Sequence, residues 1–375
     1  MGLTALQAHA EGLGRSSSGY KTGEYRGMTS AASFSDPDTE FAKLRSECGV
    51  YDLGYRAKIS LAGGDRVRWL NGMVTNNIRD LAVGNGVYAF LLNPQGRILG
   101  DLYAYNRGES IVVDTDRSQL EKVLATFDHY IIMDDVEVTD LSEQITALGI
   151  SGPVALEVLK KAGIEFPALQ PLQVHEIQCD CECGCLNCTI VRSDSLVESY
   201  EIWLGPEFVQ PLWNSLILSG AISVGHDAFE MQRIASGIPL YGVDIRERDL
   251  PQETEQARAL NFTKGCYIGQ EIVERIRSRG AVHRKFSRFL VEPGQSIPPG
   301  TRITAGEKEV GEITSAATVQ FPKGAKTVAL GYIRREVGTP GREVKVGPAV
   351  ATIVSLPGAE EQVPVEPTAA AVRPA

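Results

Sequence analysis

The sequence lacks any apolar run close to the roughly 20 residues that a membrane-spanning helix needs. Ala89–Leu92 and Tyr130–Met133 are typical of its longest apolar stretches. The first 35 residues are polar, carry Glu11 and Glu24, and contain no apolar segment typical of a secretory signal. Positive charge is in deficit, with 37 Lys and Arg against 47 Asp and Glu and a formal net charge of −10. We therefore expect a cytoplasmic protein without a membrane partner, and not one that coats nucleic acid broadly.

Nucleotide-binding loops and histidine metal motifs are also missing. The sequence has no Walker A motif, and its five His show no H-E-x-x-H spacing. Residues 84–89 match G-x-G-x-x-A, but strand-forming residues follow where a dinucleotide site needs a helix. Asn85-Gly86 is more typical of a tight turn between strands. We expect no nucleotide cofactor at this position.

The remaining composition is that of a folded protein with more than one domain. The chain has 375 residues, of which 43% are hydrophobic and 22% charged, enough for two or three cores. Strands and helices do not alternate regularly, which favours the α+β class. Short strands separated by Gly and Pro turns predict a small β-barrel or sandwich over residues 284–356. Residues 1–35 are expected to form a flexible arm and residues 357–375 a disordered tail.

Five of the seven cysteines lie between Cys179 and Cys188. We expect them at the tip of a hairpin between strands Leu172–Gln178 and Thr189–Ser193. Without a secretory signal, metal or redox chemistry is a better explanation than a disulfide framework. Thiolates at this density suit Zn²⁺, Cu(I) or an iron–sulfur cluster. The candidate ligands are Cys179, Cys181, Cys183, Cys185 and Cys188. The alternative is a loop insertion without a function.

Another cysteine occupies the most informative segment, Phe262–Gly280. Cys266 lies between glycines and just before a helix predicted to start near Ile268. The positive end of that helix and the ammonium of Lys264 would both stabilise a thiolate. The alternative is a small apolar residue packed in a turn.

The octapeptide KGCYIGQE at Lys264–Glu271 resembles the signature of the YgfZ family, folate-binding relatives of the glycine-cleavage T-protein (GcvT). Residues 49–77, 88–105, 200–204 and 230–242 resemble T-protein segments in the same order. The resemblance covers roughly residues 35–355. It implies a three-lobed ring around a central funnel that holds tetrahydrofolate. Residues 36–283 would form two lobes, with the cysteine-rich hairpin at 179–188 as an insertion, and a C-terminal β-barrel would complete the ring.

The resemblance also implies site residues. Glu201 matches the family's pterin-binding carboxylate, which can accept from N3–H and the 2-amino group together. Tyr88 matches an aromatic residue at the folate, and Arg233 a residue that can pair with a carboxylate. Asp101 aligns with the second of two aspartates that handle protonation near folate N10, while Gly100 stands at the first. Taken alone, Glu201 could be a surface strand residue and Arg233 an exposed helix residue.

Basic residues gather between Lys264 and Arg288, where seven Lys and Arg face two Glu. Such a patch suits the glutamate tail of folate, with Lys264 at its edge, or an RNA backbone over residues 275–288. A solvated helix face is the simpler alternative, since Glu271 and Arg275 form an ordinary i,i+4 pair.

Three functions remain open from the sequence. The first is a tetrahydrofolate-binding, YgfZ-like protein that assists the assembly or repair of iron–sulfur enzymes, with Cys266 as its reactive thiol and client or assembly proteins as partners. The second is an enzyme that transfers an aminomethyl or one-carbon group to tetrahydrofolate, as the T-protein does; Asp101 favours it and Cys266 counts against it. The third is a metal carrier that works through Cys179–Cys188.

Overall fold

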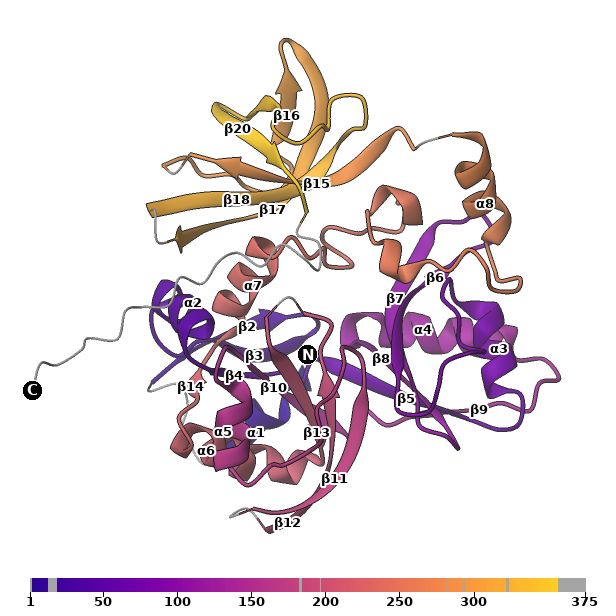
Figure 1. Ribbon diagram of the computed structural model, residues 1–375, viewed down its shortest axis with the longest axis vertical. Coiled ribbons are helices and arrows are strands. Elements are labelled where there is room, and N and C mark those ends of the chain that lie inside the picture. The colour runs from indigo at the N-terminus through magenta and orange to yellow at the C-terminus, as the bar shows by residue number, and fades with distance from the viewer. Residues whose placement is uncertain are drawn as a thin grey trace, which may run out of the picture.

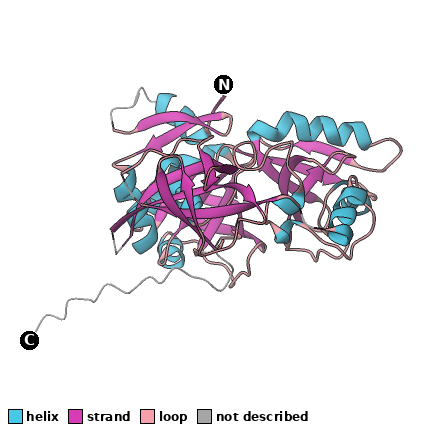
Figure 2. Ribbon diagram, turned by 90° about the horizontal axis from the view of Figure 1, so that it is seen from above, coloured by secondary structure: helices cyan, strands magenta, loops and turns pink. Residues whose placement is uncertain are grey.

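The computed structural model describes residues 2–12, 19–181, 184–195, 197–280, 282–292, 294–321 and 324–356. Within these ranges the chain forms four β-sheets (Figure 1). The C-terminal barrel lies at the top of that view, a six-stranded sheet at lower left and a five-stranded sheet on the right. Seen from above, strands fill the middle of the molecule and most helices lie around them (Figure 2).

The described N-terminal residues, 2–12 and 19–35, contain a small sheet of order β1-β3-β2, where a flexible arm was expected for residues 1–35. Its elements are β1 (Gly2–Leu3), α1 (Ala5–Gly12), β2 (Lys21–Tyr25) and β3 (Met28–Ser33). Within the described part of this segment, Gly27 serves a tight hairpin. Arg26 and Gly27 turn the chain with φ values of 49° and 90°, and Tyr25 and Met28 on either side are buried.

The six-stranded sheet supplies one wall of the central region. Its order is β11-β12-β13-β10-β4-β14, with the bounds Val174–Cys181, Gly184–Arg192, Ser199–Leu204, Thr146–Ser151, Gly49–Asp52 and Ile222–Ser223. Helices α5 (Ala155–Lys161) and α6 (Val209–Leu218) cover one face, and Leu212 and Leu216 of α6 are fully buried against it.

Most of the cysteine-rich segment belongs to strands of this sheet. β11 continues to Cys181 and β12 begins at Gly184, with Cys179 paired to Leu186 and Cys185 to Asp180. The predicted strand ends, at residues 178 and 189, were therefore wrong. No Gly or Pro lies between Gln178 and Cys181, so strand pairing extends to Cys181.

The five-stranded sheet faces the first one across the central region. Its order is β6-β7-β8-β5-β9, with the bounds Gly86–Leu92, Ile98–Asn106, Ile111–Asp116, Arg56–Ala62 and Glu137–Asp140. Helices α3 (Arg66–Met73) and α4 (Arg117–Tyr130) pack on it, and Trp69 of α3 meets Phe127 of α4 edge to face at 5.2 Å. Both helices match the predicted ones to within a few residues.

The C-terminal strands close into a barrel of order β15-β18-β17-β16-β19-β20. Their bounds are Arg284–Val291, Gly324–Arg334, Lys308–Phe321, Arg302–Ala305, Glu343–Val346 and Ala349–Val354. Apolar side chains such as Phe289, Ile303 and Ile333 fill its core. This confirms the predicted α+β fold with a C-terminal β-barrel.

Three further helices connect these units. They are α2 (Pro37–Ser46), α7 (His226–Ala235) and α8 (Gln270–Arg279). Helix α7 contacts the N-terminal hairpin, β4 and the barrel, so it lies where the units meet (Figure 1). Helix α8 starts two residues later than predicted because Gly269, at φ 81°, still belongs to the preceding loop.

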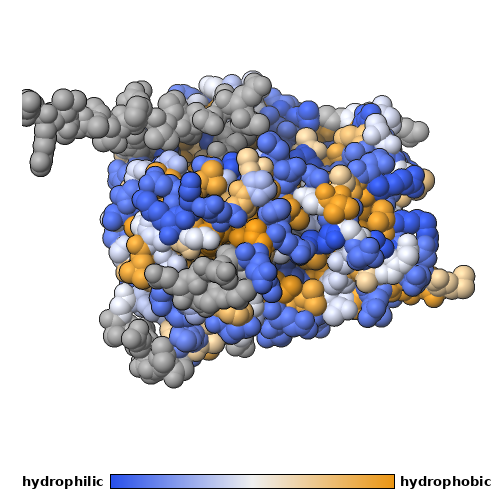
Figure 3. All heavy atoms as spheres, turned by 60° about the horizontal axis from the view of Figure 1, so that its bottom comes forward, coloured by the Kyte–Doolittle hydropathy of each residue, from blue (hydrophilic) through white to orange (hydrophobic). Residues whose placement is uncertain are grey.

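The surface carries no continuous apolar band in the view of Figure 3, where hydrophobic groups alternate with hydrophilic ones. Among the described residues, no helix has the length and apolar character to cross a membrane.

Candidate functional site

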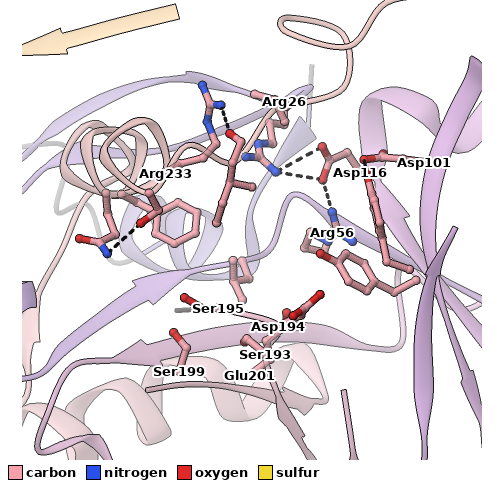
Figure 4. Close-up of a pocket in the computed structure, with 18 of the residues that line it drawn as sticks. Arg26, Arg56, Asp101, Asp116, Ser193, Asp194, Ser195, Ser199, Glu201 and Arg233 are labelled. Atoms are coloured by element: carbon pink, nitrogen blue, oxygen red, sulfur yellow. Dashed lines mark hydrogen bonds and ion pairs between the residues drawn. The ribbon is translucent and has the colours of Figure 1, made fainter. Parts of the chain in front are cut away.

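A cavity lies where the two large sheets, α7 and the N-terminal hairpin meet (Figure 4). The space outside the protein atoms is about 1030 Å³, and part of this space is open solvent. Glu201 and residues 193–195 lie on one side, with Asp101, Asp116, Arg56 and Arg26 on the other (Figure 4). The cavity therefore brings together residues from three separate units of the fold.

Aromatic rings form much of the wall. The contributing side chains are Tyr51, Tyr55, Tyr88, Tyr103, Tyr105 and Phe229. Tyr51 stacks on Phe229 with ring centroids 4.5 Å apart. Gly149 permits this position, because a Cβ there would lie 2.1 Å from the Tyr51 ring. Flat apolar walls of this kind suit a planar heterocycle.

Glu201 projects from β13 into the cavity. Its Oε2 accepts a hydrogen bond of 2.9 Å from Trp203 Nε1. Burial raises the pKa of Glu201, and the nearby charge of Asp114 raises it further, while Lys58 and Arg56 act in the opposite direction. A carboxylate has about four acceptor positions, so Glu201 keeps capacity for two more donors.

Asp101 lies on β7 within a set of neutral hydrogen-bond donors. The Tyr88 hydroxyl donates to Oδ2 at 2.7 Å, and Gln119 Nε2 donates to Oδ1 at 2.8 Å. Burial and the charge of Asp116 raise the pKa of Asp101, whereas Gln119, Tyr88 and Arg56 lower it. Asp101 is thus held in place by donors that do not neutralise its charge.

Ion pairs of alternating sign run along the wall from the five-stranded sheet toward the barrel. In order, the members are Lys58, Asp114, Arg56, Asp116, Arg26, Glu230, Arg233 and Asp244, with successive partners 2.5–3.4 Å apart. Figure 4 shows the Arg26–Asp116–Arg56 part. Burial would raise the pKa of Asp114, but Arg56 and Lys58 outweigh it and the pKa is lowered. This chain of ion pairs joins the N-terminal hairpin to both neighbouring units.

Arg233, expected at the folate, lines the cavity, but its guanidinium group donates its hydrogen bonds to other residues of the protein. Its Nε and one terminal nitrogen contact Glu230, and its other donors reach Ile238 O, Asp244 and Ser315. The side chain is only 6% exposed. Arg233 therefore connects α7 to β17 of the barrel, and its guanidinium has its five N–H groups engaged.

The cavity carboxylates fall into two classes. Asp116 is paired within the chain of ion pairs, and Asp194 with Arg258. Asp101 and Glu201 form no ion pair with any described residue. Because a desolvated carboxylate without a cation costs free energy, these two are the positions at which donors on a ligand would be favoured most.

Lys264 and Cys266 do not line this cavity. The Lys264 ammonium donates to the carbonyl oxygens of Asn71, Val74 and Asn76 at 2.5–2.8 Å, beside the C-terminal end of α3. Burial and the neighbouring Arg79 lower the pKa of Lys264 to about 7, while the three carbonyls favour its charged form. Cys266 is an exposed free thiol in the loop before α8.

Asn76 connects Lys264 to the cavity wall. The Asn76 amide donates to the carbonyl oxygens of Tyr88 and Arg258, both of which line the cavity. The structure therefore brings Glu201, Tyr88, Asp101 and Arg233 together and leaves Lys264 and Cys266 on an adjoining surface.

The basic patch at residues 264–288 is largely paired. Arg275 meets Glu271 at 2.5 Å, and Arg284 meets Asp249 at 2.6 Å and Glu253 at 3.1 Å. The last two carboxylates come from outside the segment that was counted, so the local excess of positive charge is smaller than the sequence indicated. RNA contact at residues 275–288 stays a prediction, and it is less favoured because these ion pairs already neutralise Arg275 and Arg284.

Most of the cysteine cluster falls outside what the structure describes. This holds for Cys183 and for the side chains of Cys179, Cys181 and Cys185. Cys188 is 5% exposed and packs in the core of the six-stranded sheet with Cys48. Within the described ranges, no three His, Cys, Asp or Glu side chains are grouped so as to hold a metal ion. Metal binding by the cluster stays a prediction without support from the described residues.

Sequence analysis missed three arginines that shape the cavity. Arg258 lies 4.6 Å from the Tyr88 ring centre and pairs with Asp194. Arg56 and Arg26 belong to the chain of ion pairs. Alternating polar residues around Tyr25-Arg26-Gly27 give a hairpin signal that could have identified Arg26; no local pattern identifies the other two.

The chain is similar in sequence to known proteins. Residues 15–264 match the family described as the GCVT N-terminal domain. An aminomethyltransferase of Rubrobacter xylanophilus is 27% identical over 340 residues, covering 89% of each chain. A chloroplastic protein of Arabidopsis thaliana, with a provisional transferase name, is 26% identical over 86% of this chain and 74% of its own.

A solved structure is similar over nearly the whole length. The glycine cleavage system aminomethyltransferase T of Bartonella henselae superposes with a TM-score of 0.81, at 23% identity, covering 94% of this chain and 96% of that one. This likeness confirms the fold expected from the resemblance.

Proposed function

Because this chain belongs to the GCVT N-terminal domain family, we propose that it binds tetrahydrofolate, or a one-carbon derivative, in the cavity lined by Glu201 and Asp101. One observation carries the proposal: the two carboxylates share a cavity with aromatic walls, and neither has a cationic partner among the described residues. A reduced pterin offers further N–H donors, which these carboxylates have the capacity to accept.

Glu201 is the proposed anchor for the pterin ring. It can accept from N3–H and the 2-amino group while keeping its bond from Trp203. The rings of Tyr51, Tyr88 and Phe229 supply flat surfaces for the pterin or the benzoate. The residues present therefore fit a folate.

Among the described residues, each arginine that lines the cavity is already paired with a carboxylate of the protein. Arg26 and Arg56 are bound to Asp116, and Arg258 to Asp194, so the tail would extend toward solvent. Lys264 is not a proposed ligand of the tail in this cavity, because the Lys264 ammonium is bonded to three carbonyl groups.

For the activity itself we favour a role in assisting iron–sulfur enzymes, with Cys266 as the reactive thiol. The support is the resemblance of KGCYIGQE to the YgfZ signature together with the exposure of Cys266 outside the cavity. An exposed thiol can meet a macromolecular partner that a buried one cannot. Location in the cytoplasm stays a prediction, since one relative is chloroplastic by name.

A second candidate activity is one-carbon or aminomethyl transfer to tetrahydrofolate. It is favoured by Asp101, whose raised pKa suits proton exchange with a bound ligand nearer neutral pH, and by the aminomethyltransferase names of several relatives. Gly100 at the place of the family's first aspartate counts against it.

One experiment separates the two activities. Purified protein is assayed for glycine cleavage with lipoyl carrier protein and tetrahydrofolate, and a strain deleted for the gene is assayed for iron–sulfur enzyme activity. Transfer activity that Asp101→Asn abolishes and Cys266→Ala spares supports the transferase. Absence of transfer, with iron–sulfur enzyme activity lost in the deletion strain and restored by the wild type but not by Cys266→Ala, supports the favoured role.

A further inference from the structure

A second cavity lies on the far side of β4, between α1, the N-terminal hairpin and α6. The space outside the protein atoms is about 960 Å³, again partly open to solvent. Tyr51 and Leu53 line the first cavity, and Asp52, which lies between them, lines the second. Successive residues of an extended chain point to opposite sides, so the two cavities are separated by the backbone of this segment.

Three aromatic rings form a row along the second cavity. Tyr20 and Phe34 have ring centroids 5.1 Å apart, and Phe34 and Trp213 5.5 Å apart, each pair tilted by about 35°. All three residues line the cavity, and Trp213 comes from α6 while Tyr20 and Phe34 flank the N-terminal hairpin. A cation within about 6 Å of an aromatic ring centre is attracted by the negative face of the ring.

Asp52 places a carboxylate in the same space. It accepts a hydrogen bond of 2.8 Å from Gly54 N–H and another from the Thr4 hydroxyl. Among the described residues it has no ion-pair partner. Burial raises the pKa of Asp52, and only these two neutral donors oppose the shift.

Among the described residues, the imidazole of His9 is the one basic group that lines the cavity. Tyr20 donates its hydroxyl hydrogen to Gln7 at 3.1 Å, and Gln7 donates to Glu11 at 3.1 Å. Burial raises the pKa of Tyr20, and the negative charges of Glu11 and Asp52 raise it further. Apart from His9, the charged side chains described at this end of the cavity are therefore acidic.

We propose that this second cavity binds a small organic cation, a primary or quaternary amine, with its charged nitrogen between Asp52 and the row Tyr20–Phe34–Trp213. An anion would meet the charges of Asp52 and Glu11, and a neutral apolar molecule would leave the Asp52 carboxylate desolvated without a cationic partner. An amine satisfies the carboxylate and the faces of the rings together.

The test compares a cation with its neutral isostere. The full-length protein is titrated calorimetrically with choline and with 3,3-dimethyl-1-butanol, which replaces the quaternary nitrogen by carbon. We expect choline to bind at one site at least tenfold more tightly than the alcohol. Its binding should also quench the fluorescence of Trp213, a signal that is absent in Trp213→Phe.

Variants assign the binding to this cavity. Asp52→Asn should weaken choline binding at least tenfold, and Phe34→Leu several-fold. Asp38→Asn, an exposed carboxylate of α2, is the matched control and should bind as the wild type does. Tetrahydrofolate titration of each variant reports whether the protein is folded, independently of the second site.

Three results would overturn the proposal. They are no binding of choline to the wild type at millimolar concentration, equal binding of choline and the alcohol, and choline binding that neither Asp52→Asn nor Phe34→Leu changes. None of them bears on folate binding in the first cavity.

Discussion

The hydroxyl group of Tyr88 donates a 2.7 Å hydrogen bond to Asp101 across two adjacent strands of the five-stranded sheet. The phenol ring of Tyr88 is buried, with Arg258 over its face at 4.6 Å. Tyr88 thus fixes the orientation of the Asp101 carboxylate through its hydroxyl group, in addition to lining the cavity with its ring.

Replacing Tyr88 by Phe removes this donor and keeps the ring. The bond from Tyr88 lowers the pKa of Asp101, so its loss should raise that pKa further. Because the bond favours the charged form, Tyr88→Phe should reduce the free energy of unfolding by about 1.5–3 kcal/mol at pH 7 and by less below pH 4. Urea denaturation at the two pH values measures this.

Tyr103→Phe, in the same cavity, is the control, because the Asp101 carboxylate accepts from Tyr88 and Gln119 and not from Tyr103. An equal loss of stability in both variants would contradict the account.

Glu201→Gln should make the protein more stable while it weakens folate binding. Burial raises the pKa of Glu201, so ionisation costs more in the folded chain than in the unfolded one. That cost is absent below the ordinary carboxyl pKa, grows as the pH rises through the raised pKa, and is then constant. The variant should therefore gain on the order of 1 kcal/mol at pH 7 and nothing at low pH. The exposed Glu207→Gln is the control, and a variant that is less stable at pH 7 would refute the assignment.

Arg233→Ala should be severely destabilising, because it leaves Glu230 and Asp244 buried with fewer partners. The expected loss is about 3–5 kcal/mol in the free energy of unfolding, measured by urea denaturation. Arg335 is exposed on the barrel, and Arg335→Ala should change the value by less than about 0.5 kcal/mol. A loss below 1 kcal/mol for Arg233→Ala would mean that the chain of ion pairs does not hold the barrel to α7.

Cys266→Ala should leave folate binding unchanged, since Cys266 does not line the cavity. In the wild type, a thiol reagent should modify Cys266 quickly and Cys48 only on unfolding, because Cys48 is fully buried and its pKa is raised to about 12. Mass spectrometry of partially labelled protein with and without tetrahydrofolate measures both rates. Protection of Cys266 by the ligand would show that the thiol faces the folate after all.

Local pattern predicted much of the fold. The spacing of Val123 and Phe127, both buried, predicted α4, and Pro94-Gln95-Gly96 predicted the hairpin of β6 and β7. The N-terminal sheet was missed because Gly and Ser serve flexible chains and tight hairpins equally well. The barrel was predicted because its turns repeat along the sequence.

The site was harder to predict, because its partners are far apart in the sequence. Glu201, Tyr88 and Asp101 were identified through a family resemblance, and the cavity brings them together. No local signal shows that Arg26 reaches Asp116, 90 residues away, or that Lys264 binds carbonyls about 190 residues away. Side chains that act through such contacts look, in sequence, like ordinary surface charges.

Calorimetric titration of tetrahydrofolate into the wild type, Glu201→Gln and Glu207→Gln tests the central claim most directly. The account predicts one site per chain in the wild type and in Glu207→Gln. For Glu201→Gln it predicts affinity at least tenfold weaker, as expected for loss of a charged acceptor. Equal affinity in all three proteins, or no binding to the wild type, would contradict it.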